Sequence, residues 1–279
     1  LSNDLEKIYI KGTQSGDWNI GYIPNSFGTL YLEWTNNTGI SVDLTSLTIN
    51  ESGQFLFKNI GNENITIPIF NLDPDDTQRI EIGNDNDGNI IIGAAANITG
   101  TQGLKTISLK TFNDGDITLG TPGTSGLADL QNITSIALIA SKNGNITLGD
   151  LGTNTSINKI SSFSLTTDGG VINIGNIKAK KIDNFNASGN EFSSISIGNI
   201  EISEAIDLIT ISGDVSITMG NFTGDGTVKL DSSNMTKTGI NLNFSALNGS
   251  VDITSTSKDD TISLGIEAGK VISGGGDDI

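Results

Sequence analysis

The sequence predicts an all-β fold, a parallel β-helix (solenoid) of about eleven coils with about 24 residues per coil. Two observations predict it: apolar residues alternate with polar ones in short segments, and these segments recur along the whole chain of 279 residues. Alternation at every second residue indicates a strand with one buried face. A regular repeat of about 20 to 50 residues is typical of a solenoid, in which each coil buries only a few side chains.

Each coil contains two pairs of alternating apolar residues. The first pairs are Ile8/Ile10, Leu30/Leu32, Phe55/Phe57, Ile80/Ile82, Ile107/Leu109, Ile136/Leu138, Phe163/Leu165, Phe185/Ala187, Ile209/Ile211, Val228/Leu230 and Val251/Ile253. The second pairs are Trp18/Ile20, Ile40/Val42, Ile65/Ile67, Ile90/Ile92, Ile117/Leu119, Ile146/Leu148, Ile172/Ile174, Ile195/Ile197, Ile217/Met219, Ile240/Leu242 and Ile262/Leu264. In the first six coils the second pair begins 10 residues after the first. That constant offset favours stacked coils over an antiparallel hairpin meander, the alternative that Asn-Gly turns also permit.

Turns and corners complete each predicted coil. Gly, Asn and Asp residues separate the two strands, as in Asn113–Asp116 and Lys142–Asn145, and such residues close tight turns at little steric cost. A Gly-Asn-apolar sequence follows the second strand in three coils, at Gly175–Ile177, Gly198–Ile200 and Gly220–Phe222. It predicts a corner that leads to a short third strand. Stacked Asn side chains at this corner are expected to pair along the axis of the solenoid.

The charge limits the classes of partner. The formal net charge is −17, which argues against nucleic acid and anionic membrane surfaces as partners, because both require basic patches. An acidic surface favours cations, Ca²⁺ in particular, although it also simply keeps a repetitive β-protein soluble. The chain has no Cys and no His, so thiolate and imidazole chemistry are absent. No apolar run approaches 18 residues, so no membrane span is expected.

The C-terminal residues contain the most specific motif. Ser273–Ile279 has the sequence Ser-Gly-Gly-Gly-Asp-Asp-Ile, and Thr256–Ile262, with Asp-Asp-Thr-Ile at its end, lies about eighteen residues earlier. The motif resembles the start of the glycine-rich nonapeptide of RTX proteins, G-G-x-G-x-D-x-U-x, with Ser273 in place of the first Gly. We therefore expect residues 1–255 to form the β-helix and residues 256–279 to begin an RTX-like β-roll continuous with it. The motif is broken off at residue 279, which suggests a fragment of a longer protein.

The resemblance to RTX proteins implies Ca²⁺ as a cofactor, bound by the repeat's Asp side chains and by turn carbonyls. Carried over to this chain, the predicted metal ligands are Gly274, Gly276, Asp277, Asp278, Asp259 and Asp260. A Gly-rich tail without an ion is the alternative. A weaker candidate is Asp85 with Asp87, in the sequence Asn84–Asn89, which partly resembles a Ca²⁺ loop but has no distal Glu and is also typical of a solvated turn.

An enzymatic function is not expected. Many parallel β-helices are polysaccharide lyases, which use a Lys or Arg base, and Lys178, Lys180 and Lys181 form the one basic cluster of this sequence. Aromatic platforms for sugars are missing nearby, and no spacing singles out a pair of carboxylates for hydrolysis. The cluster is therefore interpreted as a solvated corner, and a lyase remains the less favoured alternative.

In composition the chain resembles RTX-type secreted surface-layer (S-layer) proteins of Gram-negative bacteria, which are exported by type I secretion. It has few Met residues, no Cys, an acidic pI, and strands rich in Asn, Thr, Ser, Gly and Ile. The resemblance implies an extracellular, cell-surface location and a rigid tile that self-associates in a Ca²⁺-dependent two-dimensional lattice. Lipopolysaccharide is a further expected partner, through regions outside residues 1–279. The alternative is an RTX adhesin stalk that presents a ligand-binding domain.

Overall fold

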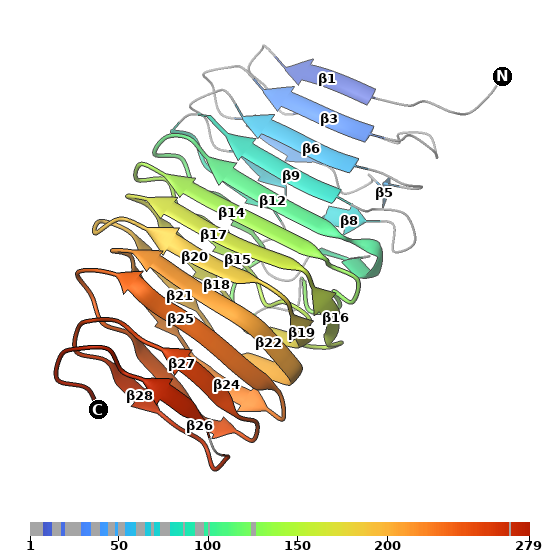
Figure 1. Cartoon of the computed structure of the whole chain (residues 1–279). Helices are drawn as coiled ribbons and strands as arrows, with labels where there is room; N and C mark the ends of the chain where they lie inside the picture. The colour runs from blue at the N-terminus through green and yellow to red at the C-terminus, as the bar shows by residue number, and fades with distance from the viewer. Residues whose placement is uncertain are drawn as a thin grey trace.

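The chain folds into a parallel β-solenoid, in which strands stack coil upon coil from β1 (Ile8–Gly12) to β29 (Lys270–Ile272) (Figure 1). The computed structural model describes residues 8–12, 18–19, 29–34, 40–43, 48–49, 54–59, 65–67, 70–72, 79–85, 87–92, 98–99, 101–123, 127–267 and 269–279. Between named strands in these ranges, neighbours pair in parallel, as in β12–β14 and β17–β20. The predicted fold class is therefore confirmed.

The first face of the solenoid follows the first strand family of the sequence. Its strands are β1 (Ile8–Gly12), β3 (Thr29–Trp34), β6 (Gln54–Asn59), β9 (Arg79–Asn84), β12 (Thr106–Thr111), β14 (Ser135–Ser141), β17 (Ser162–Asp168), β20 (Phe185–Gly189), β22 (Ile200–Gly213), β25 (Thr227–Met235), β27 (Val251–Thr254) and β29 (Lys270–Ile272). The register pairs Ile107 with Ile136 and Ile136 with Phe163, as predicted. Eleven pairing steps connect Ile8 to Val271 in these described strands.

The second face is a nine-stranded sheet that follows the second strand family. Its strands are β2 (Trp18–Asn19), β4 (Ile40–Asp43), β7 (Ile65–Ile67), β10 (Ile90–Ile92), β13 (Ile117–Leu119), β15 (Ile146–Leu148), β18 (Val171–Ile174), β21 (Ser194–Ile197) and β23 (Ser216–Met219). The register pairs Ile117 with Ile146 and Ile172 with Ile195, as predicted. Trp18 pairs with Val42 instead of the expected Ile40, a shift of two residues at the N-terminal end.

Short strands form a third face, and the three predicted corners lead into it at Ile177, Ile200 and Phe222. In the N-terminal half these are β5 (Thr48–Ile49), β8 (Phe70–Leu72) and β11 (Ile98–Thr99), followed by the 3₁₀ turn η1 (Thr101–Gly103). Further along lie β16 (Ile157–Ile160), β19 (Ile177–Ile182), β24 (Asn221–Gly224), β26 (Asn241–Leu247) and β28 (Thr261–Ser263). The prediction that Leu242 and Ile262 continue the second face is wrong, because β26 pairs with β24 and β28 and not with β23. Strand β22 spans this corner, because its start pairs with β19 and its end with β20.

A bulge in β22 changes one predicted pairing. The sequence pattern places Val228 on Ile209, whereas the structure pairs Ile206 with Val228 and Ile209 with Leu230. The two residues between Ile206 and Ile209 have no partner in β25, and Leu208 between them is partly exposed. A bulge adds residues to one strand only, so the alternation of apolar residues alone cannot reveal which strand carries them.

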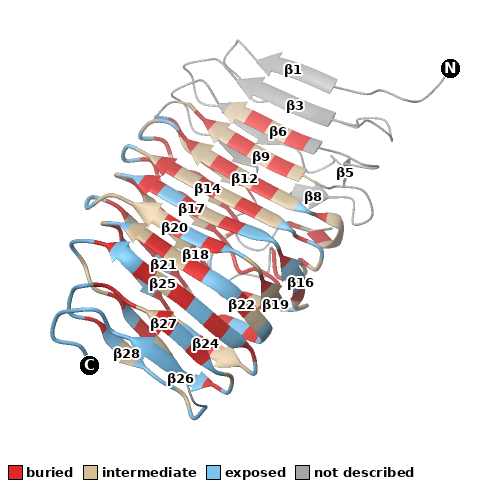
Figure 2. Cartoon of the chain, viewed as in Figure 1, coloured by how far each residue is buried: buried red, intermediate tan, exposed pale blue. Residues whose placement is uncertain are grey.

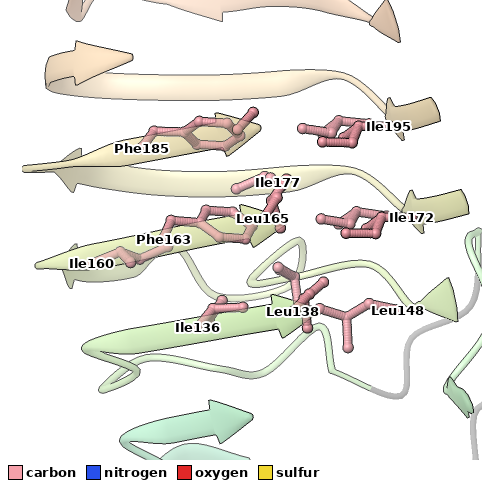
Figure 3. Close-up of a cluster of buried hydrophobic side chains, with 14 of the residues drawn as sticks. Ile136, Leu138, Leu148, Ile160, Phe163, Leu165, Ile172, Ile177, Phe185 and Ile195 are labelled. Carbon is pink, nitrogen blue, oxygen red and sulfur yellow. The ribbon is translucent and has the colours of Figure 1, made fainter. Parts of the chain in front are cut away.

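The core is a narrow column inside the coils, because alternate residues of strands such as β9, β12 and β14 are buried (Figure 2). The largest side chains stack along the axis: the ring centroids of Phe163 and Phe185 are 4.8 Å apart, and those of Phe222 and Phe244 are 4.5 Å apart. Figure 3 shows the first pair opposite Ile172 and Ile195. Each of these side chains is buried, and the buried apolar residues described between Phe55 and Ile253 form one continuous core.

Candidate metal-binding turns at the C-terminal end

The last coil contains only 18 residues, as the spacing of the motif predicts. Strand β29 stacks on β27, with Val271 paired with Ile253. Beyond the strands, the hydroxyl of Ser255 donates to the carbonyl oxygen of Ser273 at 2.7 Å. The Gly-rich sequence 273–279 therefore lies on residues 255–261, in register with them and continuous with the rest of the solenoid.

Four carboxylates of these two turns meet as two stacked pairs. The backbone N–H of Asp277 donates to Oδ1 of Asp259 at 2.8 Å, and the N–H of Asp260 donates to Oδ1 of Asp278 at 3.0 Å. Asp259, Asp277 and Asp278 are exposed to solvent. A carboxylate only accepts hydrogen bonds, so stacked carboxylates cannot bond to each other as amides can.

Asp260 differs from the other three because it is buried, with only 1% of its surface exposed. Its Oδ1 accepts hydrogen bonds from the Ile240 N–H at 2.7 Å and from the Thr256 hydroxyl at 2.9 Å. Its Oδ2 accepts one from the Thr256 N–H at 3.1 Å. Hydrogen-bond donors of the protein itself thus surround this carboxylate, which connects the turn that contains Thr256 to Ile240 in the preceding coil.

Gly274 and Gly276 have positive φ angles, 79° and 105°. A Cβ at Gly274 would overlap with the carbonyl oxygen of Thr256, and one at Gly276 would approach the backbone of Lys258 to 2.5 Å. Both positions therefore require glycine, and their carbonyls remain candidate oxygen ligands beside the exposed carboxylates. The described part of the chain holds no group of three or more acidic side chains placed around a common metal position.

The weaker candidates Asp85 and Asp87 lie in a turn that stacks on the next coil. The carboxylate of Asp85 forms an ion pair with Lys58 at 2.8 Å, and its carbonyl oxygen accepts a hydrogen bond from the Asn113 side chain. Asp87 is exposed. The turn continues into Asn89, whose Oδ1 accepts from the N–H of Asp116 at 2.9 Å. These contacts hold the turn against its neighbour and do not bring the two carboxylates to one point.

The basic cluster lies on β19, where the structure gives each lysine a partner. Lys178 pairs with Glu201 at 3.0 Å, Lys180 donates to Oδ1 of Asn158 at 2.9 Å, and Lys181 pairs with Asp207 at 2.8 Å. The hydrogen bond to Asp207 raises the pKa of Lys181 above its ordinary value. A lysine that acts as a general base needs a lowered pKa, so Lys181 is unsuited to that role.

A ladder of side chains follows the predicted corner, with its members in successive coils. Oδ1 of each member accepts a hydrogen bond from the backbone N–H of the next at 2.8–2.9 Å, from Asp150 to Asn176, Asn199 and Asn221. The side-chain amide of Asn243 continues the series by donating to Oδ1 of Asn221. Asp150 was not among the predicted corner residues, although Gly149-Asp150-Leu151 has the same Gly-polar-apolar pattern as the three predicted corners.

Comparison of the chain with family models, curated proteins and solved structures finds no match. Among the described residues no helix has the length and apolar character needed to cross a membrane.

Proposed function

We propose that the chain is a structural protein of a bacterial cell-surface layer, an exported rod that self-associates in a Ca²⁺-dependent lattice. The observation that carries the proposal is the pairing of Asp259 with Asp277, and of Asp260 with Asp278, one 18-residue coil apart. Two nonapeptides make one such coil, as in the RTX motif that the C-terminal sequence resembles. The uninterrupted stack of parallel strands supports a mechanical role, because each coil is fixed by its neighbours.

Electrostatic repulsion explains why these turns favour a divalent cation. Neighbouring strands are about 5 Å apart, so two stacked carboxylates repel each other by about 1–3 kcal/mol at effective dielectric constants of about 20–80. Ca²⁺ takes six to eight oxygen ligands, from carboxylates, backbone carbonyls and water. The exposed carboxylates of Asp259, Asp277 and Asp278, with the carbonyls of Gly274 and Gly276, are the candidate ligands. Asp260 is the weaker candidate, since it already accepts three hydrogen bonds.

The net charge of −17 also affects the assembly of copies of the chain. Copies of a strongly acidic rod repel one another in solution, and bound calcium lowers that repulsion where the copies meet. A lattice that forms only with Ca²⁺ is the expected consequence.

The test is a CaCl₂ titration of the purified chain, followed by calorimetry for binding and by negative-stain electron microscopy for assembly. We expect binding and ordered sheets with Ca²⁺, and neither in EGTA. The double variant Asp259→Asn/Asp277→Asn is expected to lose both, whereas Asp85→Asn/Asp87→Asn, a matched change in the other acidic turn, retains both. Calcium binding that only the second variant abolishes would overturn the assignment of the site.

An assay on intact cells distinguishes the proposed lattice function from the alternative function as an adhesin stalk. Chelation of calcium is expected to remove an ordered surface array. A surface that stays ordered while attachment to a host or a sugar is lost would contradict the lattice and favour the stalk.

A further inference from the structure

A solvent-exposed aromatic side chain projects from the turn between β20 and β21. Phe192 is 77% exposed, and its N–H donates to Oδ1 of Asn190 at 3.0 Å. The hydroxyl of Ser193 donates to the same oxygen at 2.8 Å, which fixes the shape of the turn. We call residues 190–193 the Phe192 turn. A large apolar side chain held in water by an ordered turn suggests a contact surface.

The surroundings of the Phe192 turn are acidic. Lys237 forms ion pairs with Glu191 at 2.5 Å and with Asp214 at 3.9 Å, and Asn190 donates to Asp168 at 2.5 Å. Three carboxylates against one ammonium give this cluster a local charge of −2.

An apolar groove lies on the solvent side of β6, β9 and β12, with a volume of roughly 200 Å³. Its described lining includes Leu56, Gly83 and Phe112, whose ring is 40% exposed. The strand register places Lys58, Gly83 and Lys110 in three successive coils, so the missing side chain of Gly83 leaves space between two lysines. We call this site the Phe112 groove.

The charge of the Phe112 groove is opposite to that of the Phe192 turn. Its charged lining consists of Lys58, Lys110 and Glu81, and Lys58 and Glu81 form ion pairs with Asp85 and Arg79. The three cations and two carboxylates together carry a net charge of +1, on a chain whose total is −17. The ammonium of Lys110 lies 4.2 Å from the centroid of the Phe112 ring, which holds the aromatic side chain beside the cation. The groove therefore presents an aromatic wall and positive charge together.

We propose that the Phe192 turn of one copy docks into the Phe112 groove of a second copy. The groove is smaller than the ~300–1,000 Å³ of pockets that enclose drug-sized molecules, and it suits one ring. Within a single molecule the two sites cannot meet, because three steps of the sheet from β12 to β20 separate them by about 14 Å. The inference rests on the proposed lattice and names one of its contacts.

The test is sedimentation velocity of the full chain in EGTA, so that the metal has no part in the result, at an ionic strength of about 0.15 M, which screens the long-range repulsion between acidic copies. Phe192→Ala removes the ring, and Gly83→Leu fills the groove. The backbone of Gly83 has no positive φ, and the nearest atom to a Cβ there is Phe112 Cε2 at 3.8 Å, so a Cβ causes no backbone strain and the rest of the leucine extends into the groove beside the Phe112 ring. Leu208→Ala, at another exposed apolar side chain, is the control.

The wild-type chain and the Leu208→Ala variant are expected to associate with increasing concentration, and each of the other two variants about ten-fold more weakly. An equimolar mixture of Phe192→Ala with Gly83→Leu is expected to form heterodimers, since one supplies an intact groove and the other an intact ring. A wild-type chain that stays monomeric, or a mixture in which the two variants ignore each other, would overturn the proposal.

Two further outcomes keep this contact distinct from the lattice itself. If Phe192→Ala and Gly83→Leu both still form Ca²⁺-dependent sheets, the proposed contact is wrong and the proposed lattice is unaffected. A Phe112→Ala variant can also be tested for binding to an immobilised uronate oligosaccharide. If this variant loses sugar binding but sediments as the wild type does, the groove is a sugar site and the proposal is overturned.

Discussion

The central coils and the C-terminal coil use the same backbone contact with different side chains. At the central corner, Oδ1 of Asn176 accepts from the N–H of Asn199, 23 residues later. At the C-terminal end, Oδ1 of Asp259 accepts from the N–H of Asp277, 18 residues later. In both regions a side-chain oxygen connects one coil to the next at 2.8–2.9 Å.

The regions differ in the charge of most acceptors: after the single carboxylate of Asp150, the central ladder continues with the neutral amides of Asn176 and Asn199, whereas the C-terminal turns stack carboxylate on carboxylate. An Asn amide is neutral and also donates, as Asn243 does to Asn221, so a column of amides stabilises itself. A column of carboxylates accumulates like charges and requires cations from solvent. The core differs as well, since Phe163 and Phe185 are buried in the central coils whereas Leu264 and Ile266 of the short last coil are exposed. We infer that the central coils are intrinsically stable and that the last coil depends on an ion.

The largest expected effect is in the central core. Phe163→Ala is expected to lower the free energy of unfolding by about 3–5 kcal/mol, because it leaves a cavity beside Phe185. Urea unfolding followed by circular dichroism measures it. The control Leu264→Ala, at a side chain 46% exposed in the last coil, is expected to change little. Equal losses in the two variants would contradict the difference between the regions.

A single glycine is expected to control the last coil. Gly274→Ala places a Cβ against the carbonyl oxygen of Thr256 at a positive φ, and strain of about 1–3 kcal/mol should separate β29 from β27. Hydrogen exchange should then be faster in Lys270–Ile272 and unchanged in the central strands. Gly275→Ala is the matched control, because the nearest atom to its Cβ is 3.7 Å away. Faster exchange in both variants would point to general fraying of the end.

The amide ladder is expected to contribute less per residue. Asn199→Ala leaves the N–H of Asn221 without its acceptor at a solvent-exposed position, a loss of about 0.5–1.5 kcal/mol. Asn199→Asp retains the acceptor and should lose less at low calcium concentration. Thermal unfolding of both variants measures the order. An Asn199→Asp variant that binds Ca²⁺ would show that charge alone, without the Gly-rich turn, is sufficient.

The smallest effect expected is a pH dependence on the third face. The hydrogen bond from Lys159, with the charge of Lys181, holds the pKa of Asp183 below its ordinary value. Because the folded pKa is lowered, this carboxylate stabilises the fold above its unfolded pKa, and that stabilisation is lost as the pH falls through the folded pKa. NMR titration should show the lowered pKa in the wild type and a higher one in Lys159→Ala. The same pKa in both would exclude Lys159 as the cause.

Periodicity predicted most of the fold because the coils repeat their apolar pattern. The pairs of Ile107 with Ile136 and of Phe163 with Phe185 follow directly from it. The 18-residue spacing likewise predicted that Asp277 stacks on Asp259. What could not be predicted depends on local three-dimensional contacts: the bulge in β22 and the burial of Asp260 among donors from residues up to 20 positions away. A sequence pattern reports spacing, and it does not report which donors surround a carboxylate.

The most direct test of the account is the register of the last coil. The chain has no Cys, so two introduced cysteines report on each other alone. Asp252→Cys/Lys270→Cys joins register partners on neighbouring parallel strands, about 4.8 Å apart and within the ~4.4–6.8 Å that a disulfide spans. Asp252→Cys/Ile272→Cys shifts one cysteine by two residues, to about 8 Å, beyond that range. Under mild oxidation, mass spectrometry should show the first pair crosslinked and the second reduced; crosslinking of the second pair alone would contradict the 18-residue coil.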